Sequence, residues 1–176
     1  MRFDTIIIGG GHSGLTRGLE ELAAGRSCLA VCTGESSRRF RDGAYSHQAH
    51  IREFKSKGGV FFFGDSVTGG EFRDGRLTAV FTENHGQTRF EADNFVIATG
   101  SFVSCGLVAF HDCIIEPVLG LDVDYYGHHS EWVVPDFYGE QPFMKFGIIT
   151  DGAGHPYKEG HPVVNLTAAG SIISRL

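Results

Sequence analysis

Apolar runs separated by glycine-rich or polar breaks open the chain, a pattern typical of parallel strands joined by helices. Residues 3–8 (FDTIII) form a short β-branched run, and glycines follow at once. Leucines then recur at helical spacing from Leu15 until Gly25, where a helix can end. Residues 28–33 (CLAVCT) form a second apolar run. Strand, glycine turn, helix and strand fit within about 30 residues, so the pattern predicts a βαβ unit.

The next part of the chain alternates between polar and apolar segments. Residues 35–46 are polar and basic, which predicts a loop. Residues 50–57 predict a short helix that ends at a pair of glycines, and the run VFFF at 60–63 predicts a third strand.

After the third predicted strand the pattern changes to short alternating runs. Residues 70–91 carry Asp-Gly and His-Gly turn signals between these runs, and predict a three-stranded antiparallel meander. The meander is inserted before a further buried strand at 95–98 (FVIA). Residues 101–147 are irregular, aromatic and rich in loops, whereas 148–150 and 163–169 predict two more strands.

Composition narrows the class of protein. The chain has 176 residues, of which 41% are hydrophobic, and it reaches no run of about 20 apolar residues, so we expect a soluble protein without a membrane span. Its net charge is −6, with acidic and basic residues interspersed, which disfavours a nucleic-acid partner. The four cysteines include no CxxC pair, so we expect reduced thiols in a cytoplasmic protein.

Gly9, Gly11 and Gly14 form a G-x-G-x-x-G pattern between the first predicted strand and the first predicted helix. Gly9 permits a tight turn, Gly11 lets a pyrophosphate approach the backbone, and Gly14 lets the helix pack closely on the strand. The helix N-terminus adds N–H groups and a partial positive charge. Together with His12 and Ser13, these glycines are predicted to hold the pyrophosphate of a nucleotide. The alternative is a Rossmann-like turn that has lost its ligand.

A carboxylate about 20 residues past the last glycine usually binds the ribose in such a site. The nearest carboxylate here is Glu35, which follows Thr33 and Gly34 at the end of the second strand. We expect these three residues near the ribose. Because Gly34 intervenes, a solvated surface role for Glu35 is an equal alternative, and the choice among FAD, NAD and FMN stays open at this point.

Two later segments, FVIATGS and NLTAAGS, resemble strand-to-turn signatures of two-motif FAD proteins. The resemblance implies that Thr99 and Gly100 lie beside the adenine nucleotide, and that the backbone of Val67 contacts the adenine. It also implies that Gly170 and Ser171 lie on the flavin side. That family usually has Gly-Asp at the last position, and the hydroxyl of Ser171 can still donate a hydrogen bond there.

Six segments along the chain fit one family. They are MRFDTIIIGGG at the start, FTENHG at 81–86, VIATGSF at 96–102, IIEPVLGLDV at 114–123, FGIITD at 146–151 and NLTAAGS at 165–171. Together they resemble the B subunit of anaerobic glycerol-3-phosphate dehydrogenase. The resemblance implies a flavin-dependent oxidoreductase subunit with FAD, or alternatively FMN, as cofactor. Such a protein takes part in oxidising sn-glycerol 3-phosphate to dihydroxyacetone phosphate, with electrons passed to the quinone pool.

The same resemblance implies partners and a location. It implies a catalytic dehydrogenase subunit and an iron–sulfur, membrane-associated subunit, so that this chain is cytoplasmic and held peripherally at the inner membrane. Family members are much longer, with a large segment between the positions of Ser46 and His50 and a further glycine turn and helix after the second motif. The resemblance therefore implies a relative shortened internally and at its C-terminal end, with weakened flavin binding and little dehydrogenase activity of its own.

No residue is predicted as a catalytic acid or base. Glu116, His111 and Asp151 are possible acid–base groups near a flavin, but each is expected to be structural. His128 and His129, together with Asp122 and Asp124, could suggest a metal site. No second ligand pair has convincing spacing, so we predict no metal.

The fold class predicted from these features is α/β. We expect a single Rossmann-like FAD/NAD(P)-binding domain over residues 1–176, in which helices flank a parallel sheet and an antiparallel β-meander is inserted. Two other functions remain open: a non-catalytic nucleotide-binding or assembly module, and an NAD-binding Rossmann protein. An exposed apolar face would favour the module.

Overall fold

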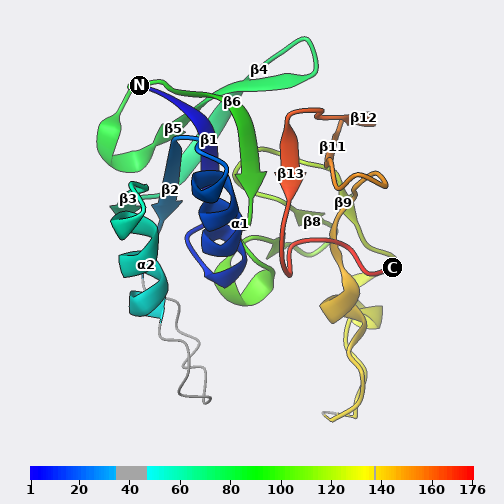
Figure 1. The fold of residues 1–176 in the computed structure, drawn as a ribbon. Coiled ribbons are helices and arrows are strands. Elements are labelled where there is room, and N and C mark those ends of the chain that lie inside the picture. Colours follow the sequence, from blue (N-terminus) through cyan, green and yellow to red (C-terminus); the bar gives the residue numbers. More distant parts are fainter. Residues whose placement is uncertain (35–46, 137) are drawn as a thin grey trace.

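The computed structural model of the chain describes residues 1–34, 47–136 and 138–176. Its main sheet contains a parallel block, in which neighbouring strands follow the order β3-β2-β1-β6-β13 (Figure 1). These strands are β1 (Arg2–Ile8), β2 (Cys28–Cys32), β3 (Val60–Phe63), β6 (Phe90–Ile97) and β13 (Leu166–Ala168). Because they are parallel, their carboxyl ends lie at one edge of the sheet.

Two further strands extend the sheet on its antiparallel side. β5 (Arg76–Thr82) pairs with the first residues of β6, and β4 (Val67–Arg73) pairs with β5. The basic loop predicted over 35–46 lies outside the described residues.

The prediction of the meander was wrong in one respect. The third strand of the meander and the strand predicted at 95–98 are a single strand, β6, which is continuous from Phe90 to Ile97. Pairing with β1 keeps Asp93 and Asn94 extended, although both residue types favour turns.

Helices α1 (His12–Ala23) and α2 (His47–Ser56) lie on the same side of the parallel strands (Figure 1). They pack against one another, with α1 against β1 and β2 and α2 against β3. The βαβ unit predicted from the first apolar runs is therefore present as β1, α1 and β2. Within the described residues, no helix is long and apolar enough to cross a membrane.

Short elements make up most of the chain after β6. The 3₁₀ turns after β6 are η2 (Phe102–Ser104), η3 (His129–Glu131) and η4 (Pro142–Lys145), whereas η1 (Glu83–His85) lies between β5 and β6. The two-residue strands pair as β7 (Val108–Ala109) with β8 (Ile114–Ile115), β9 (Val123–Asp124) with β10 (Gly147–Ile148), and β11 (Tyr157–Lys158) with β12 (His161–Pro162). The segment predicted to be irregular is thus held by isolated ladders rather than by a second sheet.

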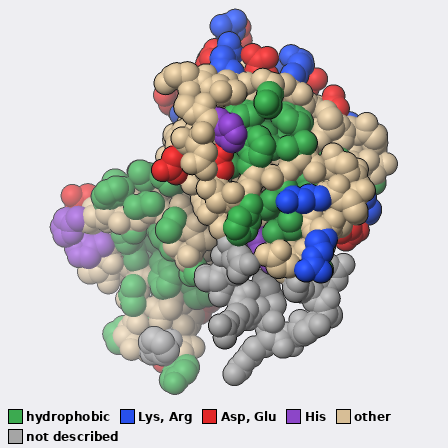
Figure 2. Space-filling view, turned by 90° about the vertical axis from the view of Figure 1, so that its left-hand side faces the viewer, with side chains coloured by type: hydrophobic (Ala, Val, Ile, Leu, Met, Phe, Trp, Pro, Cys, Tyr) green, Lys and Arg blue, Asp and Glu red, His purple; other side chains and the backbone are tan. Residues whose placement is uncertain are grey.

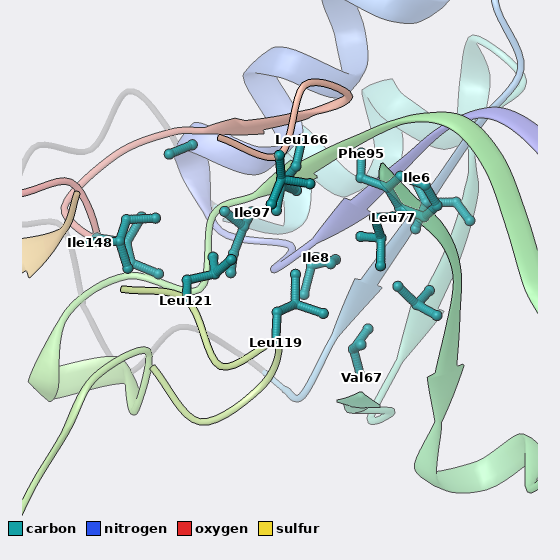
Figure 3. Close-up of a cluster of buried hydrophobic side chains, with 14 of the residues drawn as sticks. Ile6, Ile8, Val67, Leu77, Phe95, Ile97, Leu119, Leu121, Ile148 and Leu166 are labelled. Atoms are coloured by element: carbon teal, nitrogen blue, oxygen red, sulfur yellow. The ribbon is translucent and has the colours of Figure 1, made fainter. Parts of the chain in front are cut away.

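Alternate residues of β1 supply two hydrophobic cores on opposite faces of the sheet. Ile7 faces the helices, where it joins a cluster with Leu15 of α1 and Phe54 of α2. Ile6 and Ile8 face the other way, into a larger cluster with residues of the loop-rich segment (Figure 3). That cluster includes Leu119, Leu121 and Ile148, which Figure 3 shows beside Ile97 and Ile8. The irregular segment is therefore anchored by burial, which fixes the loops at the sheet's second face.

Charged side chains are interspersed on the surface. On the face shown in Figure 2, basic and acidic groups lie near one another, without an extended patch of one sign. Ion pairs such as Arg2 with Asp93 and Arg26 with Glu21 join several of them. This arrangement agrees with the distribution of charges along the sequence.

The four cysteines are free thiols that differ in exposure to solvent. Burial in β2, with a smaller contribution from Glu21, raises the pKa of the Cys28 thiol to about 12, whereas Cys105 is exposed. Because the thiolate is the reactive form, iodoacetamide at about pH 8 should modify Cys105 and leave Cys28 intact in the folded protein. Peptide mass spectrometry checks this, with urea-unfolded protein as the control in which both react. Equal labelling of both in folded protein would contradict the burial of β2.

Candidate nucleotide-binding site

The loop after β1 shows why three glycines are needed at this spacing. Gly9 has a φ of +108°, and a Cβ on it would lie 2.4 Å from the carbonyl oxygen of Ala98. A Cβ on Gly14 would lie 2.0 Å from the carbonyl oxygen of Gly9. By contrast, a Cβ on Gly11 would meet no heavy atom within 4 Å. Two of the glycines are thus required by packing, and the third faces open space in which a phosphate could approach the backbone.

Helix α1 begins directly at this open space. Its N-cap is Gly11, which provides no side-chain cap, and the first turn contains no acidic residue. The first helical hydrogen bond runs from the Leu15 N–H to the Gly11 carbonyl, which leaves the N–H groups of Ser13 and Gly14 without an intrahelical acceptor. These groups and the helix dipole favour an anion at this position.

The two later motifs come to the same place from β6 and β13. A Cβ on Gly170 would lie 2.6 Å from Ser13 Oγ, so the last turn touches the phosphate loop. A Cβ on Gly100 would lie 3.6 Å from Ser171 Oγ. Both Gly100 and Gly170 have positive φ, which glycine adopts without strain. The fold therefore brings together the three glycine turns that the sequence singled out.

Two buried polar atoms at this edge have no hydrogen-bond partner among the described residues: Thr99 Oγ1 and His47 Nδ1. Leaving such an atom unpaired costs about 1–3 kcal/mol, so a hydrogen bond from each atom to a ligand would be favourable. The other ring nitrogen of His47, Nε2, lies 2.7 Å from the carbonyl oxygen of Gly10 in the phosphate loop. The Thr99 hydroxyl lies beside the glycine turns, where it could donate a hydrogen bond to a bound nucleotide.

His47 is a site residue that the sequence did not predict. It belongs to no motif, and the only signal is its position at the start of a helix that follows a polar loop. His12, which was predicted, contributes its backbone to the loop, while its ring tilts against that of His50 of α2 at 5.0 Å between centroids. Burial, followed by the charge of His12, lowers the pKa of His50. These histidines connect α2 to the loop.

The residues predicted near the ribose are only partly described. Thr33 is exposed and follows β2 at the carboxyl edge of the sheet, and the carbonyl of Gly34 accepts a hydrogen bond from Cys32 Sγ at 3.0 Å. Glu35 lies outside the described residues. Val67 opens β4, where it pairs with Thr82, and its side chain is buried in the larger core. The contact of its backbone with an adenine stays a prediction.

Two of the three possible acid–base residues have structural contacts. The buried carboxylate of Glu116 accepts hydrogen bonds from the N–H groups of Leu119, Leu121 and Val118, which shapes that turn. Asp151 accepts from the His155 N–H at 2.8 Å, and this bond is the main reason that the pKa of Asp151 is lowered. Neither carboxylate is set up to exchange a proton with a substrate.

The chain is similar to several known proteins. The FAD binding domain family matches residues 41–176. The B subunit of anaerobic glycerol-3-phosphate dehydrogenase from Yersinia pestis bv. Antiqua is 38% identical over 127 residues, which are 72% of this chain and 30% of that protein. The corresponding protein of Vibrio cholerae serotype O1 is 40% identical over 129 residues, with the same shares. The family resemblance found in the sequence motifs is confirmed, and the chain matches less than a third of the length of these relatives.

Solved structures with a similar fold include an oxidoreductase from Agrobacterium tumefaciens. It aligns with 57% of this chain and 37% of its own, with a TM-score of 0.47 and 25% sequence identity.

Proposed function

This chain belongs to the family of FAD binding domains, and from that premise we propose that it binds FAD as part of a flavin-dependent oxidoreductase. It is a subunit of the kind represented by the B subunit of anaerobic glycerol-3-phosphate dehydrogenase, to which the chain is similar. The observation that carries the proposal is the meeting of three glycine turns at one sheet edge, with open space at Gly11. We further propose that residues 1–176 act as one cofactor-binding domain.

Each part of the cofactor has a proposed set of contacts. The pyrophosphate lies against the backbone of the first loop, and the ribose lies beyond β2. The adenine side lies at the turn after β6, and the flavin side at the turn after β13. The residues proposed for the pyrophosphate are Gly9, Gly11, His12, Ser13 and Gly14, and those for the ribose are Thr33, Gly34 and Glu35. The residues proposed for the adenine side are Val67, Thr99 and Gly100, and those for the flavin side are Gly170 and Ser171. The hydroxyl of Thr99 supplies the buried donor of the set.

The chemistry of the proposed site is divided between cofactor and chain. When bound, the flavin ring supplies the redox chemistry. The chain binds the phosphates with N–H groups of α1, orients the nucleotide between two glycine turns, and excludes water on the side of β6 and β13. Oxidation of glycerol 3-phosphate, transfer of electrons to quinone, and the dehydrogenase and iron–sulfur partners at the inner membrane are proposed for the complex in which the chain acts.

A second function, the assembly module, is favoured by one observation. The segment 101–147 exposes several large hydrophobic side chains: Val103, Phe110, Tyr126, Val133, Tyr138 and Met144. Their exposed fractions range from 48% to 95%, and exposed apolar side chains that form one patch are typical of a surface that binds another protein. The module and the oxidoreductase subunit differ in whether flavin is bound.

The visible absorption spectrum of the purified protein tests the proposed function. We expect bands of oxidised flavin, and release of about one FAD per chain on denaturation, identified by chromatography. Protein that is isolated without cofactor should regain the bands when FAD is added. A folded protein that neither contains nor takes up FAD would overturn the proposal and leave the assembly module.

Gly11→Ala should weaken FAD binding while the fold is retained. The added methyl group meets no protein atom but occupies the space in which the pyrophosphate approaches the backbone. We expect the dissociation constant for FAD to rise about tenfold or more, which corresponds to about 1.4 kcal/mol. Fluorescence titration with FAD measures it, and thermal unfolding of the same samples without FAD should differ little from wild type. Unchanged affinity would place the phosphates elsewhere.

A further inference from the structure

Three histidines from two separate segments converge on the surface, outside the residues assigned to the cofactor. His111 lies in the turn between β7 and β8, while His128 and His129 open the η3 turn. One ring nitrogen from each lies within 4.8 Å of the other two, and all three residues are exposed. Histidine side chains gathered at the tip of one lobe are visible in Figure 2.

The rings are close enough to share one ligand. The centroids of His128 and His129 are 3.9 Å apart, and those of His111 and His129 are 4.3 Å apart. A tetrahedral Zn²⁺ ion has Zn–N distances of about 2.0–2.1 Å, which require nitrogens roughly 3.3 Å apart. Exposed rings can reach that spacing from the observed one by rotating their side chains, since no core packing holds them.

Outer contacts that orient metal-bound histidines are also present. Nδ1 of His128 lies 3.1 Å from the hydroxyl of Ser130 and accepts a hydrogen bond from the Ser130 N–H at 3.5 Å. These contacts occupy Nδ1 and leave Nε2 as the ligand atom. The carboxylate of Asp112 lies 3.7 Å from Nε2 of His111 and places negative charge beside the three histidines.

We propose that His111, His128 and His129 bind one divalent first-row transition-metal ion, with Zn²⁺ as the physiological ion because imidazole nitrogens suit it. The sequence predicted no metal site, because the fold rather than the spacing brings His111 to the histidine pair. The proposal does not depend on FAD binding.

The bound ion would fasten the β7–β8 turn to η3. Each of these elements is short: the β7–β8 ladder has two residues per strand, and η3 has three residues. An ion that binds the folded arrangement stabilises it by mass action, so it would stiffen a segment that has little regular structure of its own.

Titration of untagged, EDTA-treated protein with ZnCl₂ by calorimetry tests the proposal, with Co²⁺ absorption as an independent report of the ligands. We expect one ion per chain and a higher melting temperature in Zn²⁺. His111→Ala and His128→Ala should each lower the affinity more than about tenfold, since loss of outer-shell partners alone costs about 10–100-fold. His161→Ala is the matched control, because His161 is exposed and its Nδ1 contacts only the carbonyl of Glu159 among the described residues.

Two results would overturn this assignment. One is the absence of binding by wild-type protein at micromolar Zn²⁺. The other is undiminished binding by the His111→Ala/His128→Ala double variant, which would assign the ion to other histidines, such as those beside the phosphate loop. Melting in EDTA shows that each variant is folded, because exposed rings without an ion contribute little to stability.

Discussion

Gly14→Ala should destabilise the protein by about 2 kcal/mol and abolish FAD binding. The new Cβ would lie 2.0 Å from the carbonyl oxygen of Gly9 and 3.0 Å from the Ile7 side chain. The first of these contacts is with a backbone atom, which cannot rotate away as a side chain could. The clash is therefore relieved only if α1 moves away from β1. Overpacking of this kind costs about 1–3 kcal/mol or more, and the higher helix propensity of alanine returns only about 1 kcal/mol. Urea unfolding followed by circular dichroism measures the change.

Gly11→Ala is the matched control for this experiment. It places the same methyl group three residues earlier, where no heavy atom lies within 4 Å. Its cost in the free energy of unfolding should stay within about 1 kcal/mol, because alanine is a poorer N-cap than glycine. Both variants should lose affinity for FAD, but only Gly14→Ala should lose stability. Equal stability of the two would mean that α1 does not pack on β1 as closely as the structure has it.

The local parts of the fold could be predicted from the sequence. The β1–α1–β2 unit follows from two apolar runs, one helical leucine repeat and a glycine turn, all of which act over a few residues. The phosphate loop was predicted for the same reason. The convergence of Gly100 and Gly170 on this loop followed only from a resemblance to FAD proteins, because nothing in the local pattern sets which strands become neighbours.

The non-local parts could not be predicted. Asp93 and Asn94 look like turn residues, yet pairing with β1 keeps them extended within one strand. The ladders after β6 have two residues each, too few for a period of two to be detected. His111 joins His128 and His129 only because a turn and a 3₁₀ element meet in space. In each case the determining contact joins residues that are distant in sequence.

Asn165 is the clearest example of a contact that the sequence did not reveal. It stands at the start of NLTAAGS, a segment that the sequence predicts to be a strand followed by a cofactor-binding turn, with no role for Asn165 itself. In the structure it is 6% exposed, and its carboxamide bonds the backbone of Leu77, 88 residues away. It accepts from the Leu77 N–H at 2.9 Å and donates to the Leu77 carbonyl at 2.8 Å and to the Asp93 carbonyl at 3.1 Å. One side chain thus ties β5 and β6 to the turn that leads into β13.

Asn165→Leu should therefore lower the free energy of unfolding by about 3–4 kcal/mol. Leucine has the same branched skeleton of side-chain heavy atoms but leaves the N–H and carbonyl of Leu77 buried without a partner, at about 1–3 kcal/mol each. The last glycine turn follows β13, so FAD affinity should fall with the loss of this anchor. Asn94→Leu is the matched control, because Asn94 is exposed on the neighbouring strand and its replacement should cost less than about 1 kcal/mol. Urea unfolding of both variants measures the difference, and equal costs would mean that the carboxamide of Asn165 does not hold β5 and β6 to the start of β13.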